Sequence, residues 1–267
     1  MTGTTSAPPA GQEAVEPVLL TERRGGVLVV TLNRPRQRNA LDFALRQALR
    51  DAFDAFETDP ELRCAVLTGN GPAFCAGGDL KEMAAAALQL PAEEWGLLLG
   101  SRGAVDKPVI AAVNGFALAG GFRLAQDCDL CVAADTAVFG ITEVKRGRGA
   151  PWAAPLISMV PKRVMAELLL SGEPITAGRA YEVGLINAVV PQDELVDTAI
   201  RMAETIAANA PLSVRAAKQT VELSTEIGRS QAVRSADWLY ERVYTSDDAL
   251  EGPRAFAEKR DPVWTGR

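Results

Sequence analysis

The stretch KPVIAAVNGFALAGGFRLAQDCDL (Lys107–Leu130) joins an apolar run to a glycine-rich turn and then to a short helical pattern. Its first part, Pro108–Val113, has the composition of a buried strand. The turn Gly115–Gly121 leads into a short helix predicted over Phe122–Gln126. An earlier loop, AFCAGGDL (Ala73–Leu80), is also glycine-rich and also precedes a predicted helix. Two such turns can direct two backbone N–H groups at one oxygen atom, which is the arrangement that stabilises an oxyanion.

Apolar runs and helical patterns alternate on both sides of this stretch. A helix is predicted from Ala40 to about Glu57, because apolar residues recur there at helical spacing. Further strands are predicted over Val27–Leu32, Arg63–Thr68, Leu130–Ala133 and Ala137–Gly140. Strands that alternate with helices imply crossover connections, so the predicted fold class is α/β with a largely parallel sheet that is buried on both faces.

After Pro151 the pattern becomes helical. Thr176 is predicted to cap a helix that Gly184 ends, and Pro211 is predicted to open another in its first turn. The only late strand candidate is Ile186–Val190. The last part of the chain is therefore expected to be a set of amphipathic helices, of the kind that packs on a neighbouring subunit.

Composition narrows the function classes. The 267 residues are 48% hydrophobic and 23% charged, which suits one sizeable domain. The net charge of −6 argues against a nucleic-acid partner, because such surfaces are usually basic. The chain has no histidine, which excludes histidine-based nucleophilic catalysis and histidine-ligated metals. Acid–base work must therefore fall to Glu, Asp, Lys, Tyr or Cys.

The cysteines and the termini indicate a reduced, cytoplasmic protein. Cys128 and Cys131 form a C-x-x-C, but their neighbours are typical of a buried strand and no second pair completes a metal site. Residues 1–16 are small and polar, lack the features of a signal peptide, and are predicted to form a disordered tail. The longest nearly apolar run, Val109–Phe122, is too short to span a bilayer, so no membrane partner is expected.

Six segments, taken together and in order, resemble the crotonase family of enoyl-CoA hydratases and isomerases. They are NRPRQRNALD (Asn33–Asp42), AFCAGGDLKEM (Ala73–Met83), Lys107–Leu130, FGITEVKRG (Phe139–Gly147), GEPITAGRAYEVGLINAVVP (Gly172–Pro191) and AFAEKRDPVWTG (Ala255–Gly266). The resemblance implies a crotonase-like spiral of ββα units with a C-terminal helical region. It implies an acyl-CoA-binding core over residues 17–191, an oligomerisation region over residues 192–267, and a homotrimer or a dimer of trimers.

The resemblance also implies roles for individual residues. The two N–H groups that bind the thioester oxygen fall on Gly78 and Gly120, and one family glutamate falls on Glu143. The position of the second family glutamate holds Arg123. The residues implied in binding CoA are Arg38, Ala40, Ala76, Gly77, Asp79, Leu80, Lys81, Phe256 and Lys259. No metal is implied, and no cofactor beyond the coenzyme A that the substrate carries.

Arg123 leaves three interpretations open. It can form a structural ion pair with Asp127, four residues on along the same helix. It can contact Glu143 and keep that carboxyl ionised, because an opposite charge lowers a carboxyl pKa. It can also bind a carboxylate or another polar group of an unusual acyl chain. Arg146 and Arg148, in the loop after Glu143, would support the third interpretation.

The remaining carboxylate sets the expected reaction. With Glu143 alone, the first expectation is an isomerase that moves a double bond from the 3- to the 2-position of an enoyl-CoA. One alternative is a hydratase or dehydratase of a specialised acyl-CoA, in which Arg123 orients a substrate group. The other is a non-catalytic acyl-CoA-binding protein. Trp152 is either a pocket wall or a core residue, and the far end of the pocket is expected within Met83–Arg102.

Overall fold

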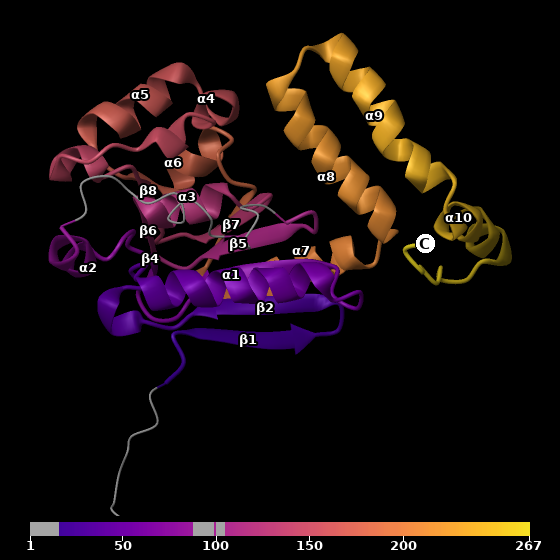
Figure 1. The fold of residues 1–267 in the computed structure, drawn as a ribbon, viewed down its shortest axis with the longest axis horizontal. Coiled ribbons are helices and arrows are strands. Elements are labelled where there is room, and N and C mark those ends of the chain that lie inside the picture. Colours follow the sequence, from indigo (N-terminus) through magenta and orange to yellow (C-terminus); the bar gives the residue numbers. More distant parts are fainter. Residues whose placement is uncertain (1–15, 88–98, 100–104) are drawn as a thin grey trace, which may run out of the picture.

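The computed structural model describes residues 16–87, 99 and 105–267 of the chain (Figure 1). The predicted tail over residues 1–16 lies, apart from Glu16, outside the described residues. Most of the Met83–Arg102 stretch, where the far end of the pocket was expected, lies outside them as well. Within the described chain no helix combines the length and the apolar content needed to cross a membrane.

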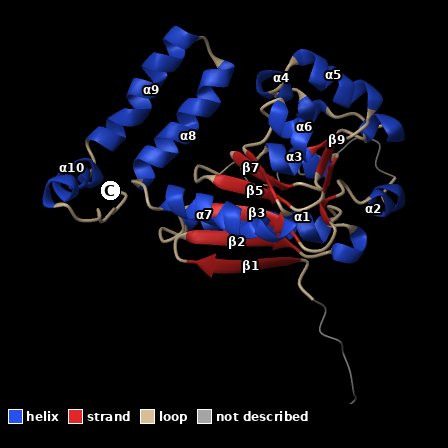
Figure 2. Cartoon of the chain, turned by 180° about the vertical axis from the view of Figure 1, so that it is seen from behind, coloured by secondary structure: helices blue, strands red, loops and turns tan. Residues whose placement is uncertain are grey.

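Strands form two sheets, of which the larger is almost entirely parallel (Figure 2). Its strands, in spatial order, are β1 (Leu19–Arg24), β2 (Val27–Leu32), β3 (Cys64–Gly69), β5 (Val109–Val113), β7 (Leu130–Ala134) and β10 (Ala188–Val190). Only β1 runs antiparallel to its neighbour. The central strands β3 and β5 have almost every residue buried, as the continuous apolar runs predict for a sheet covered on both faces.

The smaller sheet consists of short strands that follow those of the larger one. Its strands, in spatial order, are β4 (Ala73–Cys75), β6 (Phe116–Leu118), β8 (Val138–Gly140) and β9 (Ile175–Thr176). The first three are parallel, and β9 is antiparallel to β8. Consecutive strands thus alternate between the sheets, β3 with β4, β5 with β6 and β7 with β8. This alternation confirms the predicted spiral of ββα units.

Ten α-helices are described. They are α1 (Phe43–Thr58), α2 (Leu80–Ala85), α3 (Gly120–Gln126), α4 (Leu156–Met159), α5 (Lys162–Ser171), α6 (Ala177–Glu182), α7 (Leu195–Ala207), α8 (Pro211–Glu226), α9 (Arg229–Tyr244) and α10 (Asp247–Glu258). The helix predicted from Ala40 begins later, at Phe43, because Asp42 caps it by accepting a hydrogen bond from the Leu45 nitrogen at 2.9 Å. Ala40 is thereby left in the preceding loop.

Other boundaries also differ from the predictions. The helix predicted over Phe122–Gln126 begins at Gly120, so its glycine pair forms the first helical turn. Thr176 caps α6 as expected, by accepting from the Arg179 nitrogen at 3.2 Å, and Pro211 opens α8. The expectation of a single late strand was wrong, because Ile175–Thr176 also pairs with β8.

The C-terminal helices divide into two parts. α7 packs on β2, β3, β5 and β7 and buries Leu195, Ala199, Ile200 and Ala203 in the core. The helical arm that protrudes from the body of the molecule begins at α8 (Figures 1 and 2), and the predicted oligomerisation region over residues 192–267 therefore also includes α7, a helix that packs on the main sheet. Large apolar side chains are exposed on this arm: Val221, Val233, Trp238, Tyr244, Leu250 and Phe256.

The four cysteines are free and buried. Burial raises the pKa of Cys64, Cys75 and Cys131 to about 12. These thiols are therefore protonated and unreactive at neutral pH, and they act as small apolar side chains in the core.

Candidate active site

A cavity of about 950 Å³ opens where the parallel strands β4, β6 and β8 of the smaller sheet end. The turns that follow these three strands, together with the loop before α1, form its walls. Most of the residues singled out in the sequence line it: Arg38, Ala40, Ala76, Gly78, Asp79, Leu80, Lys81, Gly120, Arg123 and Glu143. Chain segments far apart in sequence thus meet at one edge of one sheet.

Gly78 presents its N–H to this cavity. Leu41 pairs with Gly78 in an isolated parallel bridge. The Leu41 nitrogen donates to the Gly77 oxygen at 2.8 Å, and the Asp79 nitrogen donates to the Leu41 oxygen at 3.2 Å. Because neighbouring peptide groups alternate in direction, the N–H of Gly78 points away from Leu41 and toward the cavity that Gly78 lines.

Gly120 presents a second N–H beside the first. It is the first residue of α3, so its N–H has no acceptor within the helix. A Cβ built on Gly120 would lie 3.6 Å from the Gly78 nitrogen, which shows how closely the two turns approach each other. The N-terminus of a helix also favours negative charge. The pair can therefore hold an oxygen that develops negative charge.

Glycine is required where the two turns touch. Gly77 has φ +96°, and a Cβ there would lie 2.8 Å from the Ala119 Cβ. A Cβ on Gly121 would lie only 2.0 Å from the Cys75 oxygen. Gly77 packs against the second turn and is not among the described residues that line the cavity, and its contact with CoA stays a prediction.

Polar contacts hold the loop that carries Arg38 and Ala40. Asn39 is fully buried, and its amide donates to the Asn70 oxygen at 3.0 Å and to the Ala73 oxygen at 2.8 Å. Arg34 bonds the Ala40 oxygen and forms ion pairs with Asp42 at 2.8 Å and with Asp79 at 3.3 Å. These contacts tie the loop before α1 to the turn that carries Gly78.

The predicted carboxylate, Glu143, lies in a 3₁₀ turn after β8. Its Oε1 accepts a hydrogen bond from the Trp152 indole nitrogen at 2.9 Å. Its Oε2 is buried and has no hydrogen-bond partner among the described residues. Burial raises the pKa of Glu143, and hydrogen bonds from its own backbone and from Trp152 oppose that rise. A carboxyl group with a raised pKa and one uncommitted oxygen is suited to general acid–base chemistry.

The other carboxylate among the described lining residues, Asp79, is already engaged in hydrogen bonds and an ion pair. Asp79 caps α2 by accepting from the nitrogens of Lys81 at 3.0 Å and Glu82 at 3.3 Å, and it is paired with Arg34. These contacts lower its pKa despite its partial burial. Among the described residues that line the cavity, Glu143 is therefore the carboxylate available for proton transfer.

Arg123 lies on α3 and is paired within its own helix. Its Nε is 3.4 Å from Asp127 Oδ2, as the first of the three interpretations predicts. Burial raises the pKa of Asp127 to about 6, and Arg123 opposes that rise. The interpretation that Arg123 keeps Glu143 ionised is not supported, because the pKa of Glu143 is raised and Arg123 is not among the causes of its shift.

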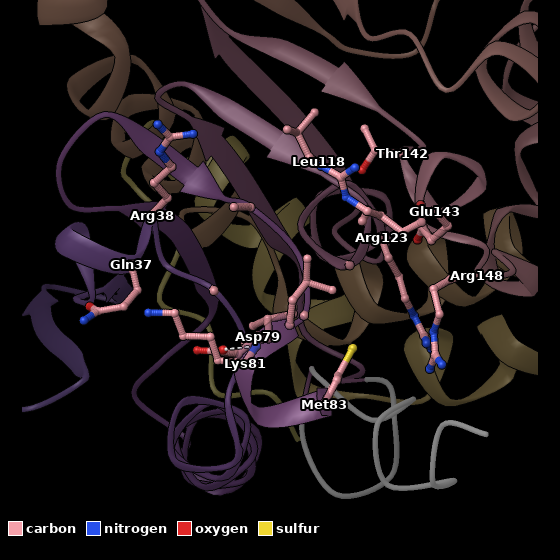
Figure 3. Close-up of a pocket in the computed structure, with 18 of the residues that line it drawn as sticks. Gln37, Arg38, Asp79, Lys81, Met83, Leu118, Arg123, Thr142, Glu143 and Arg148 are labelled. Atoms are coloured by element: carbon pink, nitrogen blue, oxygen red, sulfur yellow. Dashed lines mark hydrogen bonds between the residues drawn. The ribbon is translucent and has the colours of Figure 1, made fainter. Parts of the chain in front are cut away.

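Cationic side chains lie on both sides of the cavity (Figure 3). Gln37, Arg38 and Lys81 lie on one side, and Arg123, Glu143 and Arg148 lie on the other. The Arg38 guanidinium lies 5.7 Å from the centre of the Phe116 ring, a cation–π distance. Eight of the described lining residues are lysine or arginine, so the cavity attracts anions although the whole chain is acidic. They are Arg36, Arg38, Arg46, Lys81, Arg123, Lys145, Arg146 and Arg148.

Two predicted residues lie elsewhere. Phe256 is on α10 and is 87% exposed, and Lys259 caps the end of the same helix. α10 lies at the far end of the helical arm, away from α2 and α3 (Figure 1). Within the single chain, Phe256 and Lys259 therefore do not lie at the cavity.

The structure adds lining residues that the sequence did not single out, among them Gln37, Leu118 and Thr142. It also resolves the two alternatives for Trp152, which lines the cavity and bonds Glu143. No periodic pattern links positions 143 and 152. The available signal was local, namely Gly147 and Gly149 between them, which indicates a chain that turns back on itself.

Comparisons with known proteins agree with this geometry. A family profile described as enoyl-CoA hydratase/isomerase matches residues 22–267. Enoyl-CoA hydratase EchA19 of Mycobacterium tuberculosis is 40% identical over 94% of this chain and 97% of its own length. Carnitinyl-CoA dehydratase of Salmonella agona is 41% identical over 92% of this chain and 97% of its own length.

Solved structures give the same result. The crystal structure of an enoyl-CoA hydratase from Mycobacterium tuberculosis matches with a TM-score of 0.88 and 42% identity, covering 94% of this chain and 100% of its own. EchA1 from Mycobacterium marinum matches with a TM-score of 0.87 and 41% identity, over 94% and 100% of the two chains. The fold, the cavity and the sequence together show that this chain is an enzyme of the enoyl-CoA hydratase/isomerase family, the crotonase family.

Proposed function

We propose that this enzyme binds an acyl-CoA thioester, holds the thioester oxygen between the N–H groups of Gly78 and Gly120, and moves a proton with Glu143. The observation that carries the proposal is the buried Glu143 carboxyl, which lies in the same cavity as the two converging N–H groups. Removing a proton beside a thioester carbonyl creates an enolate oxygen. Each backbone donor would stabilise that oxygen by about 3 kcal/mol in the transition state.

Coenzyme A would lie on the side of the cavity that holds Arg38 and Lys81. Its phosphates are strongly anionic, and a guanidinium or an ammonium group can bind them by charge-assisted hydrogen bonds. The backbone of Ala40, Ala76 and Leu80 forms the adjacent wall. This placement leaves the acyl chain on the side of Glu143 and Arg123.

The predicted roles of Phe256 and Lys259 require a second subunit. We propose a homotrimer or a dimer of trimers in which the arm of one subunit brings these residues to the CoA of another. The exposed apolar side chains of the arm support this arrangement, because Trp238 and Leu250 are 73% and 76% exposed in the single subunit. The free, buried cysteines support a cytoplasmic location.

The reaction that the cavity supports best is an isomerisation, in which a double bond migrates along the acyl chain. Glu143 would remove a proton from C2 of a 3-enoyl-CoA, and the electron pair would pass to the thioester oxygen as a dienolate. The same carboxyl would return the proton to C4, which leaves the double bond between C2 and C3. One carboxyl completes this cycle, and no bound water is consumed.

The named relatives favour a second candidate, the hydration or dehydration of a specialised acyl-CoA. Here Glu143 would remove the C2 proton of a 3-hydroxyacyl-CoA and give it to the departing hydroxyl, which leaves as water. A single carboxyl can serve both steps only if proton and hydroxyl leave from the same face. In this reaction Arg123 would orient a polar group of the substrate.

The Glu143→Gln variant tests the proposal. Glutamine keeps the shape and can still accept from Trp152, but it cannot carry a proton. Turnover of 3-enoyl-, 2-enoyl- and 3-hydroxyacyl-CoA substrates should be lost, while the affinity for a CoA ligand stays within about twofold. The substrate that the wild-type enzyme converts decides between the two reactions. Unchanged turnover in the variant would refute the role of Glu143, and binding without conversion of any thioester would favour a non-catalytic acyl-CoA-binding protein.

A further inference from the structure

We propose that Trp152 is a positioning residue that selects which oxygen of Glu143 carries the proton. Its indole N–H occupies Oε1, so Oε2 is the atom that takes the proton and returns it. The proposal rests on the proposed role of Glu143 and adds to it the reacting atom and the residue that fixes that atom.

The hydrogen bond makes the two oxygens unequal. The indole nitrogen lies 2.9 Å from Oε1, and an indole N–H donates but does not accept. In a protonated carboxyl group the carbonyl oxygen is the better acceptor. The proton therefore belongs on Oε2 while Trp152 keeps its bond to Oε1.

The second carboxylate oxygen of Glu143, Oε2, has no hydrogen bond within the described part of the chain that would compete with a proton. Oε2 is buried and unpartnered among the described residues, although Glu143 lines the cavity. A buried acceptor without a donor is unusual in folded proteins, and such atoms recur at functional sites. Because Oε2 has no hydrogen bond among the described residues, it can take up a proton without losing one.

Aromatic packing holds the indole in place and links it to the other half of the site. The Trp152 ring meets Phe122 edge to face, with ring centres 5.9 Å apart, and Phe122 in turn meets Phe139 at 5.6 Å. Phe122 lies on α3, which begins at Gly120. The donor that fixes the carboxyl is thus packed on the helix whose first N–H lies in the cavity.

The bond also affects the pKa of the carboxyl. Burial raises the pKa of Glu143, and hydrogen bonds from its own backbone and from Trp152 lower it by favouring the charged form. Removing the N–H should therefore raise the pKa of Glu143 further.

The test compares three variants with the wild type. Trp152→Phe removes the N–H and keeps an aromatic ring, and a benzothienyl analogue of tryptophan at position 152 keeps the bicyclic shape with sulfur in place of N–H. Trp264→Phe is the matched control, because the Trp264 indole donates to the Ala208 oxygen at 2.8 Å outside the cavity. The readouts are the pH profile of kcat/KM and a ¹³C NMR titration of the glutamate carboxyls, assigned with Glu143→Gln.

Both changes at position 152 should lower kcat about tenfold with little change in KM, and should move the acid limb of the profile and the NMR pKa upward. Trp264→Phe should leave both unchanged. The analogue keeps the test valid if Trp152→Phe fails to fold. An unchanged pKa of Glu143 in the analogue would overturn the role of Trp152. The NMR titration tests that role even if no thioester is converted, a result that would overturn only the proposed reaction.

Discussion

Gly120 and Gly121 are adjacent, yet alanine should have opposite effects at the two positions. A Cβ on Gly121 would lie 2.0 Å from the Cys75 oxygen, 2.7 Å from the Cys75 carbonyl carbon and 2.8 Å from its Cβ. A Cβ on Gly120 would meet the end of a flexible side chain, Leu41 Cδ1, at 3.3 Å. The first clash is with backbone at the contact between two turns, and the second can be relieved by a small rotation.

These distances set the expected magnitudes. The Cys75 carbonyl would have to move away from a Cβ on Gly121 by roughly 1 Å or more to reach ordinary van der Waals contact. Gly121→Ala should therefore lower the free energy of unfolding by about 3 kcal/mol or more, the upper end of the range typical of overpacking. Gly120→Ala should change the free energy of unfolding by less than about 1 kcal/mol, because alanine also suits a helix better than glycine. Its methyl group would instead stand 3.6 Å from the Gly78 nitrogen, where the substrate oxygen is proposed to bind.

Urea unfolding and steady-state kinetics separate the two effects. Gly121→Ala should unfold at clearly lower urea, or fail to accumulate as a folded protein. Gly120→Ala should unfold like the wild type and lose about 10- to 100-fold in kcat, the range expected when an oxyanion donor is misplaced. Full activity in Gly120→Ala would refute the oxyanion site, and wild-type stability in Gly121→Ala would refute the close contact between the turns.

Four further outcomes are expected. Asn39→Ala should lower the free energy of unfolding by about 1–3 kcal/mol in urea titrations, because it removes two hydrogen bonds and leaves the buried Ala73 oxygen without its donor. Trp238→Glu should shift sedimentation from a trimer or hexamer toward the monomer while the circular dichroism spectrum stays unchanged. The raised pKa of Glu143 should make kcat/KM fall as pH decreases through it, and Glu143→Gln should lack this titration. The pKa of Asp127, raised from 3.8 to about 6, means that the folded state binds its proton more tightly than the unfolded state does. Relative to Asp127→Asn, the wild type should therefore lose stability as pH rises from about 4 through 6, by at most about 3 kcal/mol.

Sequence predicted those features that depend on local pattern. The continuous apolar runs of β3 and β5 identify buried parallel strands. The i,i+4 spacing of Arg123 and Asp127 on one helix made their ion pair one of three open interpretations, and the structure contains it. β9 escaped prediction because a pair of residues is too short to show alternation, and its register comes from β8. The first turn of α3 was not predicted as helical because glycine has a low helix propensity. Glycine is needed there because the turn packs closely on Cys75.

Contacts between different ββα units of the spiral could not be predicted from the local pattern of apolar and polar residues. The bond between Trp152 and Glu143 depends on a 3₁₀ turn that ends at Gly147, whose φ of +64° sends the chain back toward the cavity. The placement of α7 on the main sheet was missed for a similar reason. Its amphipathic pattern shows that one face is buried, but it does not show which surface covers that face.

The strand order explains why one edge of the smaller sheet collects the whole site. β4, β6 and β8 are hydrogen-bonded neighbours and run parallel, so their carboxyl ends lie side by side. Each is followed by a turn that brings one part of the site: Gly78 after β4, Gly120 after β6 and Glu143 after β8. The turns after β4 and β6 also touch each other, since a Cβ on Gly121 would lie 2.0 Å from the Cys75 oxygen. Arg123 pairs with Asp127, whereas Glu143 accepts from Trp152, so the positive charge beside the cavity and the carboxyl are held by separate contacts.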